Sequence, residues 1–268
     1  MIPIPGRLVL LGHPVGHSLS PLFQNAALRS AGIGLTYEAL DARPRDLHAL
    51  LRELKEVNAA GNVTIPHKIA VHASCDQLTD TASRAGAVNT FWFESGKLHG
   101  DNTDVGGFDA AAKALLGDET TGARVVLLGS GGAAAAVLVA IEMWPGAHVS
   151  VVARNTERAT KLVRRFQDVA RVETSVERAL AEATLIVNAT PVGQRDDEHP
   201  FDVDLLPKTT AVMDLVYKRQ GTPWVKAARE RGNPAADGLP MLLEQGALSF
   251  RRWFGVDPDR EAMRQALL

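Results

Sequence analysis

The sequence predicts a protein of the α/β class, built as two domains with a largely parallel sheet in each. Three observations favour it: short apolar runs alternate with segments of helical spacing, the alternation restarts near Gly106, and a glycine-rich segment directly follows the apolar run at 124–128. Alternating strands and helices are typical of parallel sheets covered by helices. With 268 residues, 46% of them hydrophobic, the chain is long enough for a core in each domain.

The first domain is predicted over residues 1–104. Arg7 to Leu11 is a short apolar run that stops at Gly12, which is typical of a buried strand entering a loop. After Pro21 the apolar residues follow helical spacing as far as Gly32. Further strands are expected at 36–40 and 61–65, with a helix at 47–57 between them. These elements indicate an α/β domain with a mixed, mainly parallel sheet.

The second domain is predicted over residues 105–237 and opens with an amphipathic connecting helix at 105–116. Strands are expected at 124–128, 148–153, 184–188 and 211–216, with helices to about 143 and at 157–166 after the first two. This order predicts a Rossmann-type doubly wound sheet. Residues 238–268 are assigned to the first domain, because the strongly apolar helix from Pro240 to about Trp253 needs a large surface to pack on.

Composition excludes several classes of protein. The 29 Lys and Arg nearly balance the 31 Asp and Glu, so no global charge attracts nucleic acid or an anionic membrane. Cys75 is the single cysteine, which excludes an internal disulfide, and it has no Cys or His at ligand spacing, which argues against a metal site. No basic segment followed by an apolar core opens the chain, and no apolar stretch reaches about 18 residues. We therefore expect a cytoplasmic monomer or homodimer with a small-molecule substrate.

A glycine-rich loop follows the first strand of the second domain. A strand that ends at such a loop and turns directly into a helix leaves room for a pyrophosphate and points a helix N-terminus at it. The loop residues are Gly129, Ser130, Gly131, Gly132 and Ala133. A tight turn with no ligand is the alternative, and the surrounding order of strands and helices favours dinucleotide binding.

The second strand of that domain predicts the choice of dinucleotide. An acidic residue at its end would hold the 2′-hydroxyl of NAD, whereas this chain has Arg154, with Arg158 near the start of the next helix. Two guanidinium groups suit a 2′-phosphate. The sequence therefore predicts NADP(H) as cofactor, with surface arginines of no function as the alternative.

Polar side chains also gather in three short segments of the first domain. The segment 62–68 carries Thr64 and ends at Lys68, while the segments 86–90 and 100–104 carry Asn89 and Asp104. Taken singly, such a lysine is usually a solvated surface charge and such an aspartate a helix cap. Together, a lysine, an amide, a hydroxyl and a carboxylate can bind and protonate a small polyhydroxylated molecule.

These segments resemble motifs of the shikimate dehydrogenase family, in that family's order and over nearly the whole chain. They are Gly12-His13-Pro14, Ser18-Leu19-Ser20-Pro21, Asn62-Val63-Thr64-Ile65-Pro66-His67-Lys68, Gly86-Ala87-Val88-Asn89-Thr90, Asp101-Asn102-Thr103-Asp104, Gly129-Ser130-Gly131-Gly132-Ala133, Asn188-Ala189-Thr190 and Asp237-Gly238-Leu239-Pro240-Met241-Leu242. The resemblance implies reduction of 3-dehydroshikimate to shikimate with NADPH, in the pathway to aromatic amino acids.

The resemblance also implies roles for individual residues. Lys68 and Asp104 would form the catalytic pair, with Lys68 the proton donor and Asp104 orienting it. The substrate would be bound by Ser18 and Ser20 at its carboxylate and by Thr64, Asn89 and Gln245 at its oxygens, with Tyr217 nearby. The cofactor would be held by the loop from Gly129 to Ala133 at its pyrophosphate, by Arg154, Asn155 and Arg158 at its adenosine phosphate, and by Met213 and Gly238 near the nicotinamide.

Two other functions fit parts of the sequence. A quinate/shikimate dehydrogenase that uses NAD or NADP would need room for the extra hydroxyl of quinate, and Ser20 and the two arginines argue against it. A metabolite-sensing homologue without turnover would be expected to lack Lys68, Asp104 or the cofactor glycines, and this chain retains all of them.

Overall fold

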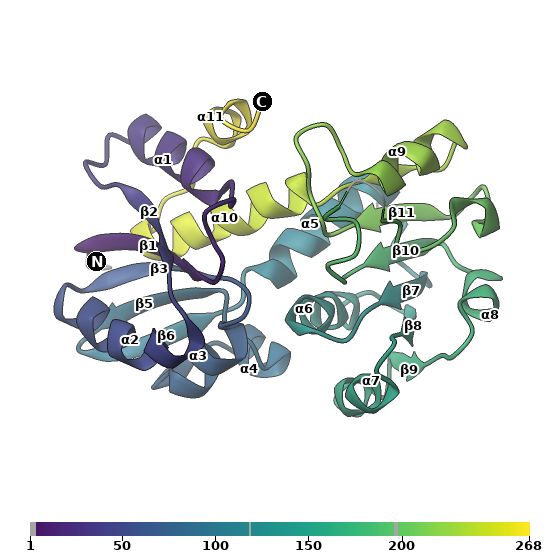
Figure 1. Ribbon diagram of the computed structural model, residues 1–268, viewed down its shortest axis with the longest axis horizontal. Coiled ribbons are helices and arrows are strands. Elements are labelled where there is room, and N and C mark those ends of the chain that lie inside the picture. Colours follow the sequence, from purple (N-terminus) through teal and green to yellow (C-terminus); the bar gives the residue numbers. More distant parts are fainter. Residues whose placement is uncertain (1–3, 118, 196–197) are drawn as a thin grey trace. The chain divides into compact units, whose positions relative to one another are not determined.

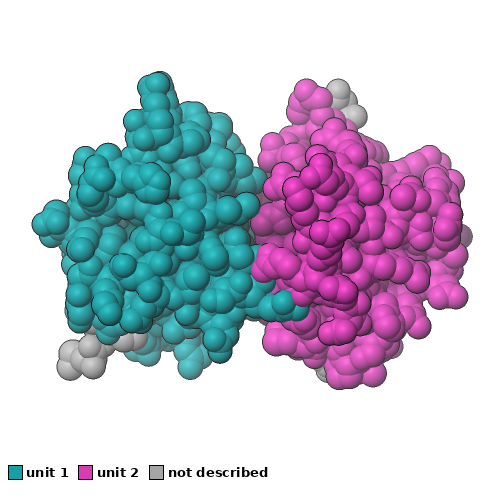
Figure 2. Space-filling model, turned by 90° about the horizontal axis from the view of Figure 1, so that it is seen from below, with its two compact units in different colours: residues 1–107, 242–268 teal, residues 108–241 magenta. Residues whose placement is uncertain are grey.

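The computed structural model describes residues 4–117, 119–195 and 198–268. The chain forms two compact units, coloured separately in Figure 2. Unit 1 comprises residues 1–107 and 242–268, and unit 2 comprises residues 108–241. The chain leaves unit 1 within helix α5 (Asp104–Leu116) and returns to it within helix α10 (Leu239–Phe254). Both units combine a β-sheet with helices, which confirms the predicted α/β class.

Within the described part of unit 1, six strands form a mixed sheet in the order β2-β1-β3-β5-β6-β4. The strands are β1 (Arg7–Gly12), β2 (Tyr37–Asp41), β3 (Ala59–Val63), β4 (Gln77–Leu78), β5 (Thr90–Glu94) and β6 (Lys97–Asp101). β1 pairs in parallel with β2 and β3, and β4 with β6. β5 runs antiparallel to both β3 and β6. The sheet is therefore mixed, as predicted.

Helices cover both faces of this sheet, with α1 and α10 on one face and α2 and α3 on the other (Figure 1). The remaining helices of unit 1 are α1 (Ser20–Ser30), α2 (Leu47–Glu56), α3 (Lys68–Ser74), α4 (Asp80–Ala85) and α11 (Arg260–Gln265), and Pro44–Asp46 forms a short 3-10 turn. Every residue of β3 is buried, because a strand covered on both faces has no solvated side. One core cluster joins Leu51 and Leu54 of α2 to Val63 and Phe91 of the sheet.

Four strand ends of unit 1 lie at the same edge of the sheet. Leu11 pairs with Val63 near the ends of the parallel strands β1 and β3. β5 is antiparallel to β3, so its first residue, Thr90, pairs with Asn62 near the end of β3. Thr90 also pairs with Asp101, the last residue of β6. Loops that follow β1, β3 and β6, and the loop that precedes β5, therefore emerge together.

Within the described part of unit 2, six strands form an all-parallel sheet in the order β12-β11-β10-β7-β8-β9. The strands are β7 (Arg124–Leu128), β8 (His148–Val152), β9 (Ala170–Val172), β10 (Leu185–Asn188), β11 (Ala211–Asp214) and β12 (Ala235–Ala236). The helices are α6 (Gly132–Ile141), α7 (Thr156–Val163), α8 (Val176–Leu180) and α9 (Pro223–Glu230), with a 3-10 turn at Val203–Leu205. Counted from β7, the order is that of the Rossmann fold, as predicted.

The β5–β6 hairpin of unit 1 is absent from the sequence prediction, as are α3, α4, α9 and α11. The turn of the β5–β6 hairpin places Ser95 at φ 50° and Gly96 at φ 72°. Both residues have the left-handed conformation that a two-residue hairpin turn requires. The third strand also ends earlier than expected, at Val63 rather than residue 65. This difference places Thr64 in the loop beyond the strand.

Candidate active site

Lys68 is held at the first turn of α3 by two backbone anchors. Its own carbonyl accepts a hydrogen bond of 2.9 Å from the backbone N–H of Val88. The preceding residue, His67, is buried, and its Nε2 donates to the carbonyl of Ala42 at 2.6 Å. Both bonds fix the start of the helix, so the Lys68 side chain begins from a defined backbone position.

Lys68 and Asp104 form an ion pair inside unit 1. The Nζ of Lys68 lies 2.5 Å from Oδ2 of Asp104. The two side chains are 18% and 8% exposed, respectively. Removal of a cation and an anion from water costs free energy, and only close pairing and further hydrogen bonds offset that cost. Asp104 is the first residue of α5, where a negative charge also meets the positive end of the helix.

The side-chain amide of Asn89 connects Asp104 to Gln245. Its Oδ1 accepts a 2.7 Å bond from the backbone N–H of Thr103. Since a backbone N–H can only donate, this bond assigns the oxygen and turns Nδ2 toward the acceptors. Nδ2 then donates to Oδ1 of Asp104 at 2.8 Å and lies 3.2 Å from Oε1 of Gln245. Lys68, Asn89, Asp104 and Gln245 therefore form one connected cluster.

Ser18 and Thr64 lie in loops at the same sheet edge, whereas Ser20, expected in the first of these loops, is the buried first residue of α1. None of the three makes a hydrogen bond to this cluster in the described structure. Ser18 lies between β1 and α1, and its Oγ accepts a 3.2 Å bond from the N–H of Ser20. Thr64 follows β3, and its N–H donates to Leu11 at 2.8 Å. Ser18 and Thr64 are half-buried. The hydroxyls of Ser18 and Thr64 therefore remain able to reach a ligand.

The cluster combines three chemical abilities. Lys68 is a cationic donor that can hold or release a proton, and Asp104 accepts hydrogen bonds at both of its oxygens. The amides of Asn89 and Gln245 offer donors and acceptors to a polar ligand. Such an arrangement suits proton transfer at a hydroxyl or carbonyl group of a small polar molecule.

In unit 2, the glycine loop leads from the end of β7 into α6. Gly129 has φ +116°, and a Cβ placed there would lie 3.0 Å from the carbonyl oxygen of Ala189, so only glycine fits without strain. A Cβ on Gly131 would meet nothing closer than the Nη2 of Arg158, at 3.9 Å. Ser130, Gly132 and Ala133 are half-buried at the helix start. The loop can hold a phosphate group at a helix N-terminus.

Arg158 reaches the glycine loop, since its Nη2 lies 3.9 Å from where a Cβ on Gly131 would be. Arg154 is exposed just after the end of β8. Asn155 is the N-cap of α7, where its Oδ1 accepts a 2.8 Å bond from the backbone N–H of Arg158. The two arginines therefore flank a helix start, and the cap holds that start in shape. These cations, the open loop and the strand order together fit an NADP molecule.

The remaining predicted site residues are Met213 and Gly238, expected near the cofactor, and Tyr217, expected near the substrate. Met213 lies within β11 with no exposed surface. Tyr217 is half-buried after the same strand. Gly238 is buried beside Leu215, where a Cβ would lie 2.5 Å from the carbonyl oxygen, so the backbone approach itself requires glycine. Gly238 also donates its N–H to Val216 at 3.1 Å, so it holds the loop after β11 against the start of α10.

Sequence reasoning missed two sets of polar residues. The hydroxyls of Thr90 and Thr103 lie 3.1 Å from Oδ1 of Asn89, and the hydroxyl of Ser249 contacts both threonine hydroxyls. Thr90 and Thr103 lie inside the quoted motifs, and Ser249 lies one helical turn beyond Gln245. In unit 2, Asp214 accepts bonds from Asn188 and Thr222, each 2.8 Å long. Burial raises the pKa of Asp214 to about 6. The signal for it was the motif at Asn188, which lies on the neighbouring strand.

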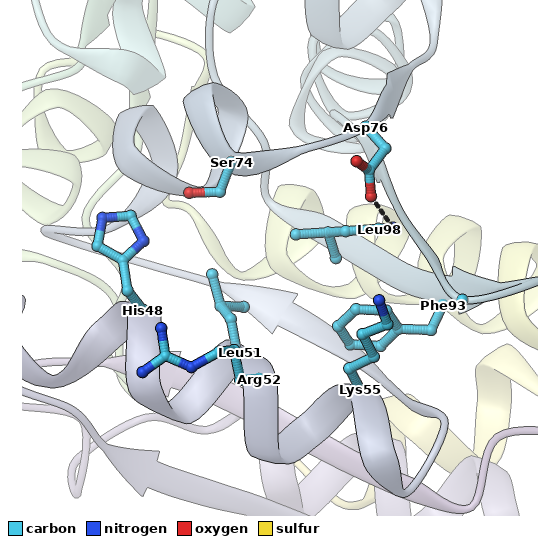
Figure 3. Close-up of a pocket in the computed structure, with 9 residues that line it drawn as sticks. His48, Leu51, Arg52, Lys55, Ser74, Asp76, Phe93 and Leu98 are labelled. Carbon is cyan, nitrogen blue, oxygen red and sulfur yellow. Dashed lines mark hydrogen bonds between the residues drawn. The ribbon is translucent and has the colours of Figure 1, made fainter.

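A separate hollow of about 490 Å³ lies in unit 1 (Figure 3). Its lining includes the apolar residues Leu51, Phe93 and Leu98 and the basic residues His48, Arg52 and Lys55. At one side the carboxylate of Asp76 accepts a 2.7 Å bond from the N–H of Leu98. None of the predicted site residues lines this hollow.

Two searches of the described residues gave negative results. Across 4–117, 119–195 and 198–268, no three His, Cys, Asp or Glu side chains are grouped so that they could hold a metal ion. Among the helices of the same ranges, none combines the length and apolar character needed to cross a bilayer.

Comparison with known proteins gives consistent matches over both units. Residues 10–91 match the family model described as the shikimate dehydrogenase substrate binding domain, and residues 238–268 match the shikimate 5'-dehydrogenase C-terminal domain. The chain is 40% identical to shikimate dehydrogenase (NADP(+)) of Aquifex aeolicus, over 92% of this chain and 91% of that protein.

Solved structures give the same result. The crystal structure of shikimate 5-dehydrogenase from Thermus thermophilus in complex with NADP(H) and shikimate is 38% identical and has a TM-score of 0.88, covering 97% of this chain and 98% of that one. Quinate dehydrogenase from Corynebacterium glutamicum in complex with NAD is 31% identical with a TM-score of 0.87, covering 97% of each chain.

Proposed function

The chain belongs to the shikimate dehydrogenase family, and from that premise we propose that it is an NADP-dependent oxidoreductase that interconverts 3-dehydroshikimate and shikimate. The observation that carries the proposal is the ion pair of Lys68 and Asp104, bonded to Asn89 and, through it, to Gln245. In the biosynthetic direction the enzyme reduces the ketone and supplies shikimate to the pathway that makes aromatic amino acids.

Unit 1 binds the substrate in this proposal. Ser18, before α1, and Ser20, its first residue, hold the substrate carboxylate through their hydroxyls. Thr64, Asn89 and Gln245 bind the ring oxygens, which are a ketone and hydroxyls that need both donors and acceptors. Tyr217 of unit 2 is assigned to the same substrate as a further polar contact.

Lys68 and Asp104 manage the proton. NADPH, when bound, supplies the hydride that a ketone carbon accepts. Negative charge then develops on the carbonyl oxygen, which needs a proton or a nearby positive charge. Lys68 provides both from Nζ, and Asp104 holds that nitrogen in position from Oδ2 while Asn89 holds its other oxygen. In the oxidative direction Lys68 takes the proton back from the substrate hydroxyl.

Unit 2 binds the cofactor. The loop from Gly129 to Ala133 holds the pyrophosphate at the start of α6. Arg154 and Arg158 hold the 2′-phosphate, which Asn155 assists by capping α7. Met213 and Gly238 are assigned to the nicotinamide region, where Gly238 fixes the backbone beside Leu215. NADP is therefore the proposed cofactor rather than NAD.

One chain carries both sets of residues, so we propose that a single copy is sufficient for turnover, as a monomer or as a homodimer with two complete sites, and that it acts in the cytoplasm. Specific activity that stays constant on dilution is expected. Activity that falls as copies dissociate would contradict this part of the proposal.

The proposed function is tested by initial rates of NADPH formation, followed by absorbance, with shikimate and NADP. Rates with quinate and with NAD, measured side by side, test the specificity. We expect the highest kcat/KM with shikimate and NADP. Faster turnover of quinate, or with NAD, would favour the quinate dehydrogenase alternative. Binding of shikimate without turnover by any pair would favour the metabolite-sensing alternative.

A further inference from the structure

Three hydroxyl groups form a closed triangle beneath the proposed active site. The Oγ1 of Thr90 lies 2.7 Å from Oγ of Ser249 and 3.1 Å from Oγ1 of Thr103, and the last two are 2.9 Å apart. Thr90 and Ser249 have no exposed surface and Thr103 is 6% exposed. Buried hydroxyls at these distances must share their protons in a consistent pattern.

The direction of the hydrogen bonds is fixed at one end of this triangle. The amide of Asn62 lies 3.1 Å from the backbone carbonyl of Asn89, which can only accept, so the atom facing it is Nδ2. The Oδ1 of Asn62 therefore accepts the 2.8 Å bond from the Tyr37 hydroxyl. Burial raises the pKa of Tyr37, so the phenol keeps the proton that it donates. One hydrogen of the Asn62 Nδ2 bonds to the Asn89 carbonyl, and the other is left for Ser249 at 2.8 Å, with Oγ1 of Thr90 3.0 Å from the same nitrogen.

The direction is also fixed at the other end. Oδ1 of Asn89 accepts from the backbone N–H of Thr103 at 2.7 Å, and the hydroxyls of Thr90 and Thr103 lie 3.1 Å from the same oxygen. Each threonine hydroxyl has one proton, so the threonine that does not donate to Ser249 can donate to this oxygen. Nδ2 faces Asp104, Gln245 and, at 3.0 Å, Oγ1 of Thr103. A flipped amide would put its NH₂ against the Thr103 N–H and turn its oxygen toward the carboxylate.

Ser249 extends this arrangement to α10. Its hydroxyl donates its own proton to the carbonyl of Gln245 at 2.9 Å. Its oxygen is consequently an acceptor for Asn62 and for a threonine hydroxyl. One serine thus joins the helix that carries Gln245 to the strand end that carries Asn89. Neither Thr90 nor Ser249 bonds directly to Lys68 or Asp104 in the described structure. The contacts that lead from them toward that pair run through Asn89 and through Thr103, the residue before Asp104.

We propose that Thr90 and Ser249 are positioning residues for the reaction proposed above. The Thr90 hydroxyl lies against the Asn89 oxygen, and Ser249 holds that hydroxyl in place, so that the amide keeps the orientation that binds Asp104. The inference rests on the proposed function for its effect on rate, although the orientation of Asn89 can be measured without any substrate. Loss of either hydroxyl is expected to leave Asn89 and the Asp104 carboxylate less well held.

The first test compares Thr90→Val, which keeps the shape and removes the hydroxyl, with Thr90→Ser, which keeps the hydroxyl. Thr210→Val is the matched control, because Thr210 is a fully buried threonine of unit 2 whose hydroxyl donates to a backbone carbonyl at 2.8 Å. We expect Thr90→Val to lower kcat/KM for shikimate about 10- to 100-fold, as small misplacements in active sites do. The KM for NADP should stay constant, and Thr90→Ser and Thr210→Val should stay within about threefold of wild type.

A second variant separates a shared network from independent effects. Ser249→Ala should lower kcat/KM for shikimate in the same direction as Thr90→Val. Because both hydroxyls act through Asn89, the double variant should be only slightly slower than the slower single variant. Losses that multiply in the double variant would contradict a shared action through Asn89.

The orientation of Asn89 is read from its side-chain NH₂ signals in proton–nitrogen correlation spectra. We expect protected signals in the wild type and Thr90→Ser, and exchange-broadened signals in Thr90→Val. If this pattern appears in a wild type that does not turn over shikimate, the proposed function is wrong and the positioning stands. Unchanged signals and rates in Thr90→Val, with an active wild type, would overturn the positioning.

Discussion

The two units build their parts of the proposed site from different materials. Unit 1 uses side chains, and Lys68, Asn89 and Asp104 are joined by hydrogen bonds between particular atoms. Unit 2 uses backbone at the glycine loop, where the absence of a side chain is the essential property, and adds exposed arginines at its rim. The chemistry should therefore be sensitive to polar substitutions in unit 1, and cofactor binding to steric and charge changes in unit 2.

The largest effect is expected for Lys68→Ala. Removal of the only charged donor of the described cluster should lower kcat by about 10²- to 10⁴-fold, the range typical of general acid–base groups. The KM values for shikimate and NADP should change little, since the cofactor is assigned to unit 2. Steady-state kinetics with both substrates varied gives these constants. A variant with nearly normal kcat would remove Lys68 from the reaction.

Gly129→Ala should weaken cofactor binding by the glycine loop of unit 2. A Cβ at this position lies 3.0 Å from the Ala189 carbonyl, on a backbone at φ +116°, which costs about 1–3 kcal/mol for a residue other than glycine. The Kd of NADPH, measured by fluorescence, should rise about 10-fold or more, while shikimate binding stays unchanged. Gly34→Ala is the control, because its Cβ would meet nothing within 4 Å. A Gly129→Ala variant that binds NADPH as tightly as the wild type would show that cofactor binding does not depend on glycine beside the Ala189 carbonyl.

The arginine rim is tested by the double variant Arg154→Gln/Arg158→Gln. Loss of two cations facing a 2′-phosphate should raise the KM for NADP about 10- to 100-fold, at about 1–2 kcal/mol for each charge-assisted bond. The KM for NAD should change less than about threefold, because NAD lacks that phosphate. Arg171→Gln, another exposed arginine of unit 2, controls for general charge. Equal losses for both cofactors would contradict the assignment of the arginines to the phosphate.

Asp214 gives a smaller, pH-dependent effect within unit 2. Burial raises its pKa from 3.8 to about 6, and nearby Asp237 adds to the rise, while bonds from Thr222, Asn188 and Val216 oppose it. The folded state therefore holds this proton more tightly than the unfolded state, so its contribution to stability is complete below about pH 4 and is lost as the pH rises through about 6. From pH 7 to pH 5 the free energy of unfolding should gain about 1 kcal/mol from this group.

Urea unfolding of the wild type and Asp214→Asn at both pH values measures this contribution. The free energy of unfolding should rise by about 1 kcal/mol more in the wild type than in Asp214→Asn when the pH falls from 7 to 5. Asparagine keeps one acceptor for Asn188 and Val216 and can donate to the Thr222 oxygen, so the cluster keeps its contacts with the Thr222 bond reversed. The same pH slope in both proteins would show that Asp214 does not titrate in this range.

Much of the fold could be predicted from the sequence because several strands of both sheets are apolar runs with clear ends, whereas β4, β9 and β12, each of two or three residues, were missed. The strand at Arg124–Leu128 was predicted with its observed bounds, since Gly129 stops it. The β5–β6 hairpin was missed, because Thr90 to Asp101 mixes aromatic, charged and glycine residues around a turn at Ser95 and Gly96. Propensity alone does not separate such a segment from a loop.

The site was predictable in part for a similar reason. Lys68, Asn89, Asp104 and Gln245 were named from motifs, and the structure joins them by hydrogen bonds. The roles of Thr90 and Ser249 depend on contacts between α10 and β5, separated by 159 positions in the chain. A local pattern contains no information on such contacts, and serine at an interior helix position usually indicates only weak helix propensity.

The coupling of Lys68 and Asp104 is tested most directly by the kcat of the double variant Lys68→Ala/Asp104→Asn, beside the two single variants. Residues that act as one unit lose nearly everything with the first substitution. The double variant should therefore be no more than about threefold slower than the slower single variant. Single losses that multiply in the double variant would contradict a joint action of the two residues that form the 2.5 Å ion pair.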